Sequence, residues 1–92
     1  MPQRTAVVAA AAGLHARPAH LFVEAVARTG LPVTIAVPGR PPVDARSILM
    51  VMSLGAGQGT EVTLSVEGPD ADMALDALVG QLESDPDAGP GA

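Results

Sequence analysis

The residues best suited to chemistry lie between Gly13 and Ala19, where a histidine, His15, stands two positions before an arginine, Arg17. Apolar residues recur at helical spacing after this pair, so His15 is expected at or next to the N-cap of a helix. Backbone N–H groups at such an end lack partners within the helix and attract anions. Pro18 suits a first turn, because a proline there has no helical hydrogen bond to lose.

The chemistry that these groups favour is phosphoryl transfer. A neutral imidazole carries a ring-nitrogen lone pair that can attack an electrophile such as phosphorus. A phosphoryl group on His15 would meet helix N–H donors, from Ala16 onward, and the planar guanidinium of Arg17, each charge-assisted hydrogen bond contributing about 1.5–3 kcal/mol. The residues alone leave a second interpretation open, in which His15 is a polar turn residue and Arg17 a solvated charge.

Two motifs in order resemble a known family. The sequence Gly-Leu-His-Ala-Arg-Pro-Ala at 13–19 is followed by Arg-Ser-Ile-Leu at 46–49 and Val-Met-Ser-Leu-Gly at 51–55. This pattern resembles HPr, the histidine-containing phosphocarrier of the bacterial phosphoenolpyruvate-dependent sugar phosphotransferase system. The resemblance implies that His15 receives phosphate from enzyme I and passes it to a sugar-specific enzyme IIA, with Ala16 and Arg17 binding the phosphate.

The same resemblance implies a carrier protein rather than an enzyme, without a cofactor and located in the cytoplasm, and we expect a monomer. A second function stays open at this point, a regulatory module on the same fold that docks partner proteins and never transfers phosphate. The presence of both His15 and Arg17 favours the carrier.

The segment that follows Ser47 and stops at Gly55 is predicted to be a short helix. It holds more apolar residues than one core-facing stripe needs, so some of them must be exposed, and an exposed apolar patch suggests a docking surface, a use that the family makes of this helix. The residues assigned to the partner-docking patch are Ile48, Leu49 and Met52. Met50 stands where the family commonly has a glycine. The resemblance also implies that a serine kinase can phosphorylate Ser47, although an N-cap explains a serine here equally well.

The remaining segments predict an α+β scaffold. Strands are expected at 4–10, 33–37, 43–45 and 60–67, and helices at 16–29 and 47–54. A last helix is expected after residue 70, with apolar positions at Ala71, Leu75, Leu78 and Leu82. The strand at 60–67 alternates, with Val62, Leu64 and Val66 on a buried face and polar residues on the other. Asp70 is expected to cap the last helix. This order predicts an open-faced β-sandwich, a four-stranded antiparallel sheet with three helices on one face, which is also the architecture that the HPr resemblance implies.

Composition narrows the remaining possibilities. The 92 residues carry a net charge of -5 and no cysteine, which predicts one domain over 1–83, a disordered tail over 84–92 and no thiolate metal site. The acidic balance argues against general nucleic-acid binding. No apolar run approaches the ~20 residues that span a bilayer, so membrane insertion is not expected. His15 and His20 lie about 140° apart on a helix and cannot share a metal ion, so no metal site is expected.

Overall fold

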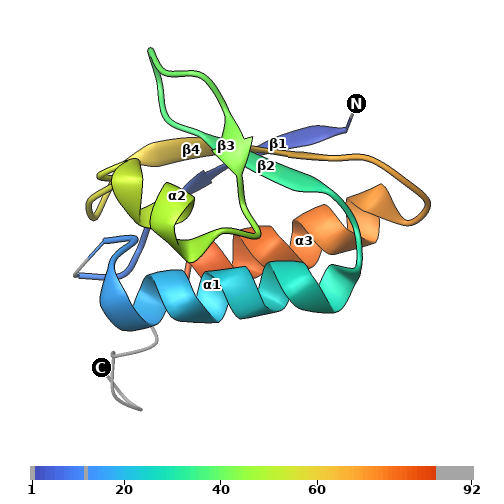
Figure 1. The fold of residues 1–92 in the computed structure, drawn as a ribbon, viewed down its shortest axis with the longest axis horizontal. Helices are drawn as coiled ribbons and strands as arrows, with labels where there is room; N and C mark the ends of the chain where they lie inside the picture. Colours follow the sequence, from blue (N-terminus) through green and yellow to red (C-terminus); the bar gives the residue numbers. More distant parts are fainter. Residues whose placement is uncertain (1, 12, 85–92) are drawn as a thin grey trace.

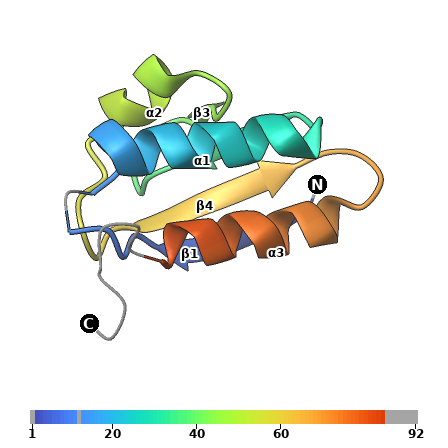
Figure 2. The ribbon, with the colours of Figure 1, turned by 90° about the horizontal axis from the view of Figure 1, so that it is seen from below.

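A computed structural model describes residues 2–11 and 13–84. The strands are β1 (Gln3–Val7), β2 (Val33–Ala36), β3 (Val43–Asp44) and β4 (Glu61–Val66), and the helices are α1 (Ala16–Thr29), α2 (Ile48–Ser53) and α3 (Ala71–Leu82). The sheet order is β1-β4-β2-β3, and every neighbouring pair is antiparallel. Helices α1 and α3 run antiparallel on one face of the sheet, and α2 lies beside the start of α1 (Figure 1 and Figure 2). The predicted open-faced α+β sandwich is confirmed.

One apolar core fills the space between the sheet and the helices. Phe22, the single aromatic residue of the chain, is fully buried in this core, as is Val26 one helical turn later. The sheet contributes the fully buried Ile35 and Leu64, and α3 contributes Leu75. Burying side chains of this size contributes about 1.5–3 kcal/mol each. The helical and strand periods of the sequence therefore select the faces that meet in the core.

The first strand is shorter than predicted. It ends at Val7 rather than at residue 10, although the Val8 N–H still donates to the Thr60 carbonyl at 3.0 Å. The next N–H, that of Ala9, donates instead to the Leu82 carbonyl at the end of α3. Successive N–H groups of an extended strand point to opposite sides, so the Ala9 N–H faces away from β4 and bonds to the end of α3.

Two polar residues differ from the sequence prediction. Asp70 occupies the N-cap position of α3 as expected, but its φ is 61° and its side chain makes no cap hydrogen bond. The capping prediction is wrong in mechanism, because a side-chain cap needs extended backbone at that residue.

Ser65 was expected on the exposed face of β4, yet only 8% of its surface is exposed. Because β4 is an interior strand, Ser65 is flanked in register by Gln3 on β1 and Thr34 on β2.

The segment before α1 lies against the segment after α2. The Leu14 N–H donates to the Ala56 carbonyl at 2.7 Å, and Gly13 adopts a left-handed backbone with φ of 71°. A Cβ atom at Gly13 would lie 2.5 Å from the Ala56 oxygen and 2.8 Å from the Gly57 Cα. Only glycine allows this approach, which brings His15 close to the end of α2 although about forty residues separate them in the chain.

Replacing Gly13 by alanine should therefore lower the free energy of unfolding by about 2 kcal/mol or more, since left-handed strain and a backbone clash add together. Gly30→Ala is the matched control. Gly30 has a similar φ of 67° with nothing within 4 Å of its added Cβ, so strain alone should cost about 1 kcal/mol. Urea denaturation of both variants measures the difference, and equal losses would contradict the close approach at Gly13.

Candidate functional site

His15 lies immediately before α1 and is exposed to solvent. Its backbone is extended, with φ of -143° and ψ of 153°, as an N-cap residue requires. Its side chain makes no cap hydrogen bond, and its backbone N–H donates to the Gly13 carbonyl at 2.9 Å. The imidazole is accessible at a helix N-terminus and does not use its nitrogens to cap that helix.

Ala16, the first residue of α1, has an unusual backbone conformation that the sequence did not predict. Its φ is 50°, in the left-handed region, where a residue with a Cβ costs about 1–2 kcal/mol. The surrounding structure holds this conformation, because Leu14 is anchored to Ala56 on one side and α1 follows on the other. A backbone turn of this kind between His15 and Arg17 sets the direction in which the chain enters the helix.

The first turn of α1 is electropositive. Backbone N–H groups at positions such as Ala16 and Arg17 have no acceptor within the helix. The side chain of Arg17 is exposed in the same turn, which contains no acidic residue. A cation at the positive end of a helix dipole is unfavourable by about 0.3–1 kcal/mol, and an anion bound there reverses the sign. Pro18 is buried and has no backbone N–H group, so the backbone donors that directly follow His15 are those of Ala16 and Arg17.

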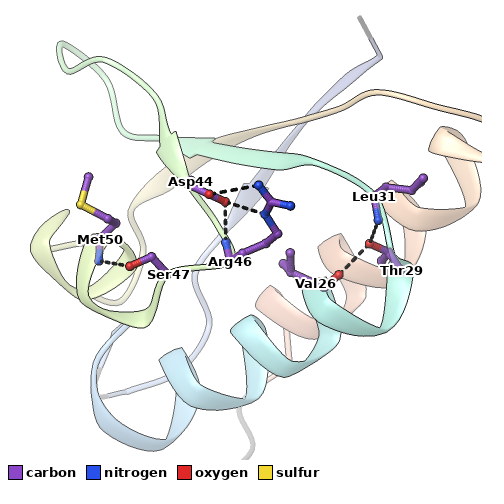
Figure 3. Close-up of polar contacts among 7 residues, drawn as sticks. All are labelled: Val26, Thr29, Leu31, Asp44, Arg46, Ser47 and Met50. Atoms are coloured by element: carbon purple, nitrogen blue, oxygen red, sulfur yellow. Dashed lines mark hydrogen bonds and ion pairs between the residues drawn. The ribbon is translucent and has the colours of Figure 1, made fainter.

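Ser47 caps the amino end of α2, as the sequence predicts. Its Oγ accepts a hydrogen bond from the Met50 N–H at 3.4 Å, and its carbonyl accepts one from the Val51 N–H at 3.0 Å (Figure 3). The Ser47 side chain is half-buried. The serine that precedes this short helix therefore has a structural role, whatever else it does.

The turn just before Ser47 is held by an exposed ion pair. The Nε and Nη2 atoms of Arg46 donate to the two carboxylate oxygens of Asp44 at 3.2 and 3.3 Å, and the Arg46 backbone N–H donates to Oδ1 at 2.9 Å (Figure 3). These hydrogen bonds lower the pKa of Asp44 and raise that of Arg46. Because the pKa of Asp44 is depressed, its small contribution to stability is present above the usual carboxyl pKa and is lost as the pH falls through the folded value.

The apolar residues of α2 divide between the core and the surface. Val51 and Leu54 belong to the core, whereas 73% of the surface of Leu49 and 43% of that of Met50 are exposed. Two others, Ile48 and Met52, are partly buried against the core. Of the three residues assigned to a docking patch, only Leu49 is strongly exposed. Met50 is a further candidate for the docking patch that the sequence analysis missed, because its apolar residue type does not distinguish it from the buried Val51.

The other titratable groups near α1 offer no second site. His20 Nε2 lies 3.5 Å from Glu24 Oε1, one helical turn away on α1, where His20 is exposed and Glu24 is half-buried. Among residues 2–11 and 13–84, no group of three or more His, Cys, Asp or Glu side chains could hold a metal ion. In the same residues, no helix has the length and apolar character needed to cross a membrane.

Comparison with known proteins shows the family. The family model described as the PTS HPr component phosphorylation site matches residues 2–84. A phosphocarrier protein HPr from Streptomyces coelicolor is 47% identical over 78 residues, which are 85% of this chain and 84% of that protein.

Solved structures agree. The crystal structure of an HPr from Bacillus anthracis is 40% identical, with a TM-score of 0.82 over 88% of this chain and 95% of the other. An HPr structure from Thermoanaerobacter tengcongensis is also 40% identical, with a TM-score of 0.83 over 90% and 92% of the two chains. Another structure from that organism is described as an HPr dimer, with a TM-score of 0.68.

These relatives are carrier proteins rather than enzymes. The chain belongs to the HPr family, the phosphocarriers of the phosphotransferase system.

Proposed function

We propose that His15 accepts a phosphoryl group from enzyme I and passes it to a sugar-specific enzyme IIA. The observation that supports this most directly is the accessible His15 imidazole, not used as a cap, at the electropositive start of α1. A ring-nitrogen lone pair forms a bond to phosphorus while the bond from phosphorus to the donor breaks. In the second transfer the bond from the ring nitrogen to phosphorus breaks, and the acceptor on enzyme IIA takes the group.

The first turn of α1 stabilises the transferred group to a moderate extent. The N–H groups of Ala16 and Arg17 and the guanidinium of Arg17 are the donors for the phosphoryl oxygens, with about 1.5–3 kcal/mol for a charge-assisted hydrogen bond. The helix dipole adds about 0.3–1 kcal/mol at an exposed end. A carrier must also release its cargo, and a shallow, solvent-exposed site limits how tightly the group is held.

The exposed part of α2 is the docking surface in this proposal. Helix α2, which carries the exposed Leu49 and Met50, lies beside the start of α1, the helix that His15 precedes (Figure 1). The half-buried Ile48 and Met52 form the margin of this docking surface. Methionine adapts to differently shaped partners, which suits a protein that must dock on both enzyme I and enzyme IIA. We propose that it does so as a cytoplasmic monomer.

Ser47 is the residue through which a serine kinase would regulate the carrier. A phosphate there adds about -1.5 to -2 charges at a helix N-terminus, where negative charge is tolerated, so the fold should survive. Its effect should fall on the incoming phosphoryl group or on an acidic partner surface, where a charge at ~10 Å costs about 1 kcal/mol at an intermediate dielectric.

Substitutions of His15 and Arg17 should distinguish the nucleophile from the cation that binds the transferred phosphoryl group. His15→Ala should abolish acceptance of phosphate from phosphoenolpyruvate and enzyme I with little loss of stability, because His15 is exposed. Arg17→Ala should slow transfer by about 10- to 100-fold, and Arg17→Lys should restore part of the rate, since lysine keeps the charge without the planar fork. Rapid-quench labelling measures these rates. Labelling of the His15→Ala protein at another residue would contradict the assignment of His15.

The docking patch is tested by a charge in its centre. Leu49→Asp should weaken binding to enzyme I by about tenfold or more without changing the melting temperature, because Leu49 is largely exposed. Met73→Asp is a matched control, since 71% of Met73 is exposed on α3, outside the patch. Calorimetric titration with enzyme I, accompanied by thermal melts, gives both quantities. Equal affinities for the two variants would remove α2 from the interface.

Variants of Ser47 distinguish the cap from regulation. Ser47→Ala should lower the free energy of unfolding by about 0.5–2 kcal/mol, whereas Ser47→Asp should keep the cap and the stability. The aspartate variant should nonetheless accept phosphate several-fold more slowly in low salt, with a deficit that shrinks as salt is raised. Ser53→Ala, which removes the other serine of α2, should change neither quantity greatly. A wild-type rate for Ser47→Asp in low salt would leave Ser47 as a cap only.

A further inference from the structure

Helix α2 is too short to be stable by itself. It has six residues, and isolated helices shorter than about 12–15 residues are marginal in water. Ser47 supplies partners for its amino end. Its carboxyl end has no basic residue in the last turn, so the negative end of the helix dipole is not neutralised from within the helix. Other parts of the chain must supply what this end lacks.

The carbonyl groups at the end of α2 can be accounted for one by one. The Met50 carbonyl accepts a hydrogen bond from the Ser53 hydroxyl at 2.6 Å, and the Val51 carbonyl accepts one from the Leu54 N–H at 3.3 Å. The Met52 carbonyl accepts one from the Gly55 N–H at 3.2 Å. The last two, those of Ser53 and Leu54, accept hydrogen bonds from one guanidinium. This is Nη1 of Arg40, at 3.4 and 3.3 Å.

Arg40 comes from the loop between β2 and β3, and this loop is stiff. The Arg40 N–H closes a turn on the Val37 carbonyl at 3.2 Å, with Pro38 and Gly39 in the central positions. Gly39 has a φ of 82°, as the third residue of a type II turn requires. Two prolines, 41 and 42, follow Arg40 and restrict φ on its other side. Little backbone freedom is left to the residue that reaches across to α2.

Arg40 therefore places a cation at the negative end of α2 and donates to its last two carbonyls. The loop and the helix end border a groove of about 350 Å³, lined by Arg40, Pro41, Val43, Ser53 and Leu54, and the Arg40 hydrogen bonds join its two sides. Two residues beyond Leu54, the Ala56 carbonyl accepts the Leu14 N–H next to His15. The end of α2 is thus connected to the β2–β3 loop and also to the loop that carries His15.

We infer that Arg40 is a positioning residue, which holds α2 so that Leu49 and Met50 face the partner that docks beside His15. The inference rests on the proposed function, because it assigns α2 the docking role. The hydrogen bonds of the Arg40 guanidinium go to the carbonyls of Ser53 and Leu54, not to His15. Its loss should loosen α2 and weaken docking, while the chemistry at His15 proceeds as before once the partner is bound.

Three variants test this inference. Arg40→Met removes the donors and the charge but keeps much of the apolar stem, and Arg40→Lys keeps the charge. Arg4→Met is the matched control, because Arg4 is also an exposed arginine whose guanidinium has a partner, Asp76 of α3, and it belongs to β1, which packs against β4 and α3. Two measurements are made on each. One is hydrogen exchange of the α2 backbone amides in the unbound protein, and the other is the KM and kcat of enzyme I for the carrier.

We expect Arg40→Met to speed exchange of the α2 amides several-fold and to raise KM by about three- to tenfold with kcat within twofold, since one clamp of modest strength is lost. Arg40→Lys should recover part of both effects, and Arg4→Met should show neither. Unchanged exchange in α2, with or without a change in KM, would overturn the inference, because Arg40 would then not position the helix. Failure of the wild-type chain to accept phosphate would refute the proposed function instead, and the exchange measurement would still decide the role of Arg40 in holding α2.

Discussion

The close approach of two loops is the constraint on which the site depends. The segment before α1 packs against the segment after α2 so tightly that Gly13 has no room for a side chain, and the Leu14 N–H uses the Ala56 carbonyl as its acceptor. One contact between backbones therefore determines where His15 stands relative to α2. An insertion or a larger residue in either loop would separate His15 from the surface proposed to recognise its partners.

The helix ends at this site are treated in opposite ways. The start of α1 carries Arg17, no acidic residue in its first turn and no side-chain cap hydrogen bond, an arrangement that favours an anion. Helix α3 shows the ordinary arrangement, with Asp72 in its first turn. Helix α2 has both ends satisfied from within the protein, by Ser47 and by Arg40. The start of α1 thus differs from the two ends of the short helix α2, in keeping with the different roles proposed for them.

Local patterns in the sequence were sufficient for much of the fold. The bounds of α1 at 16–29 were predicted to the residue, and a last helix was predicted after Asp70 with apolar positions up to Leu82, because the apolar positions of both helices repeat at the helical period. The family model matches residues 2–84 and so confirms the family resemblance that the two motifs indicated. The roles of His15, Ala16, Arg17 and Ser47 remain predictions that the structure is compatible with.

Features that depend on distant parts of the chain could not be predicted. The left-handed backbone of Ala16 is not suggested by its residue type, whereas aspartate, as at position 70, is among the residues that adopt this conformation more readily. Met50 and its neighbour Val51 are both apolar, so residue type alone does not show that Met50 is exposed and Val51 is buried. The Arg40 contact joins residues 13 and 14 positions apart, across a turn and an edge strand, and no local signal marks it.

The central claim is that His15, and no other residue, carries the phosphoryl group against the first turn of α1. The most direct measurement is a ¹H–¹⁵N NMR spectrum of the labelled chain before and after incubation with phosphoenolpyruvate and a catalytic amount of enzyme I. The account predicts that the His15 ring nitrogens and the backbone amides of Ala16 and Arg17 change most, and that mild acid reverses the change. Changes centred on Ser47 or His20 instead, or a spectrum that enzyme I leaves unaltered, would contradict it.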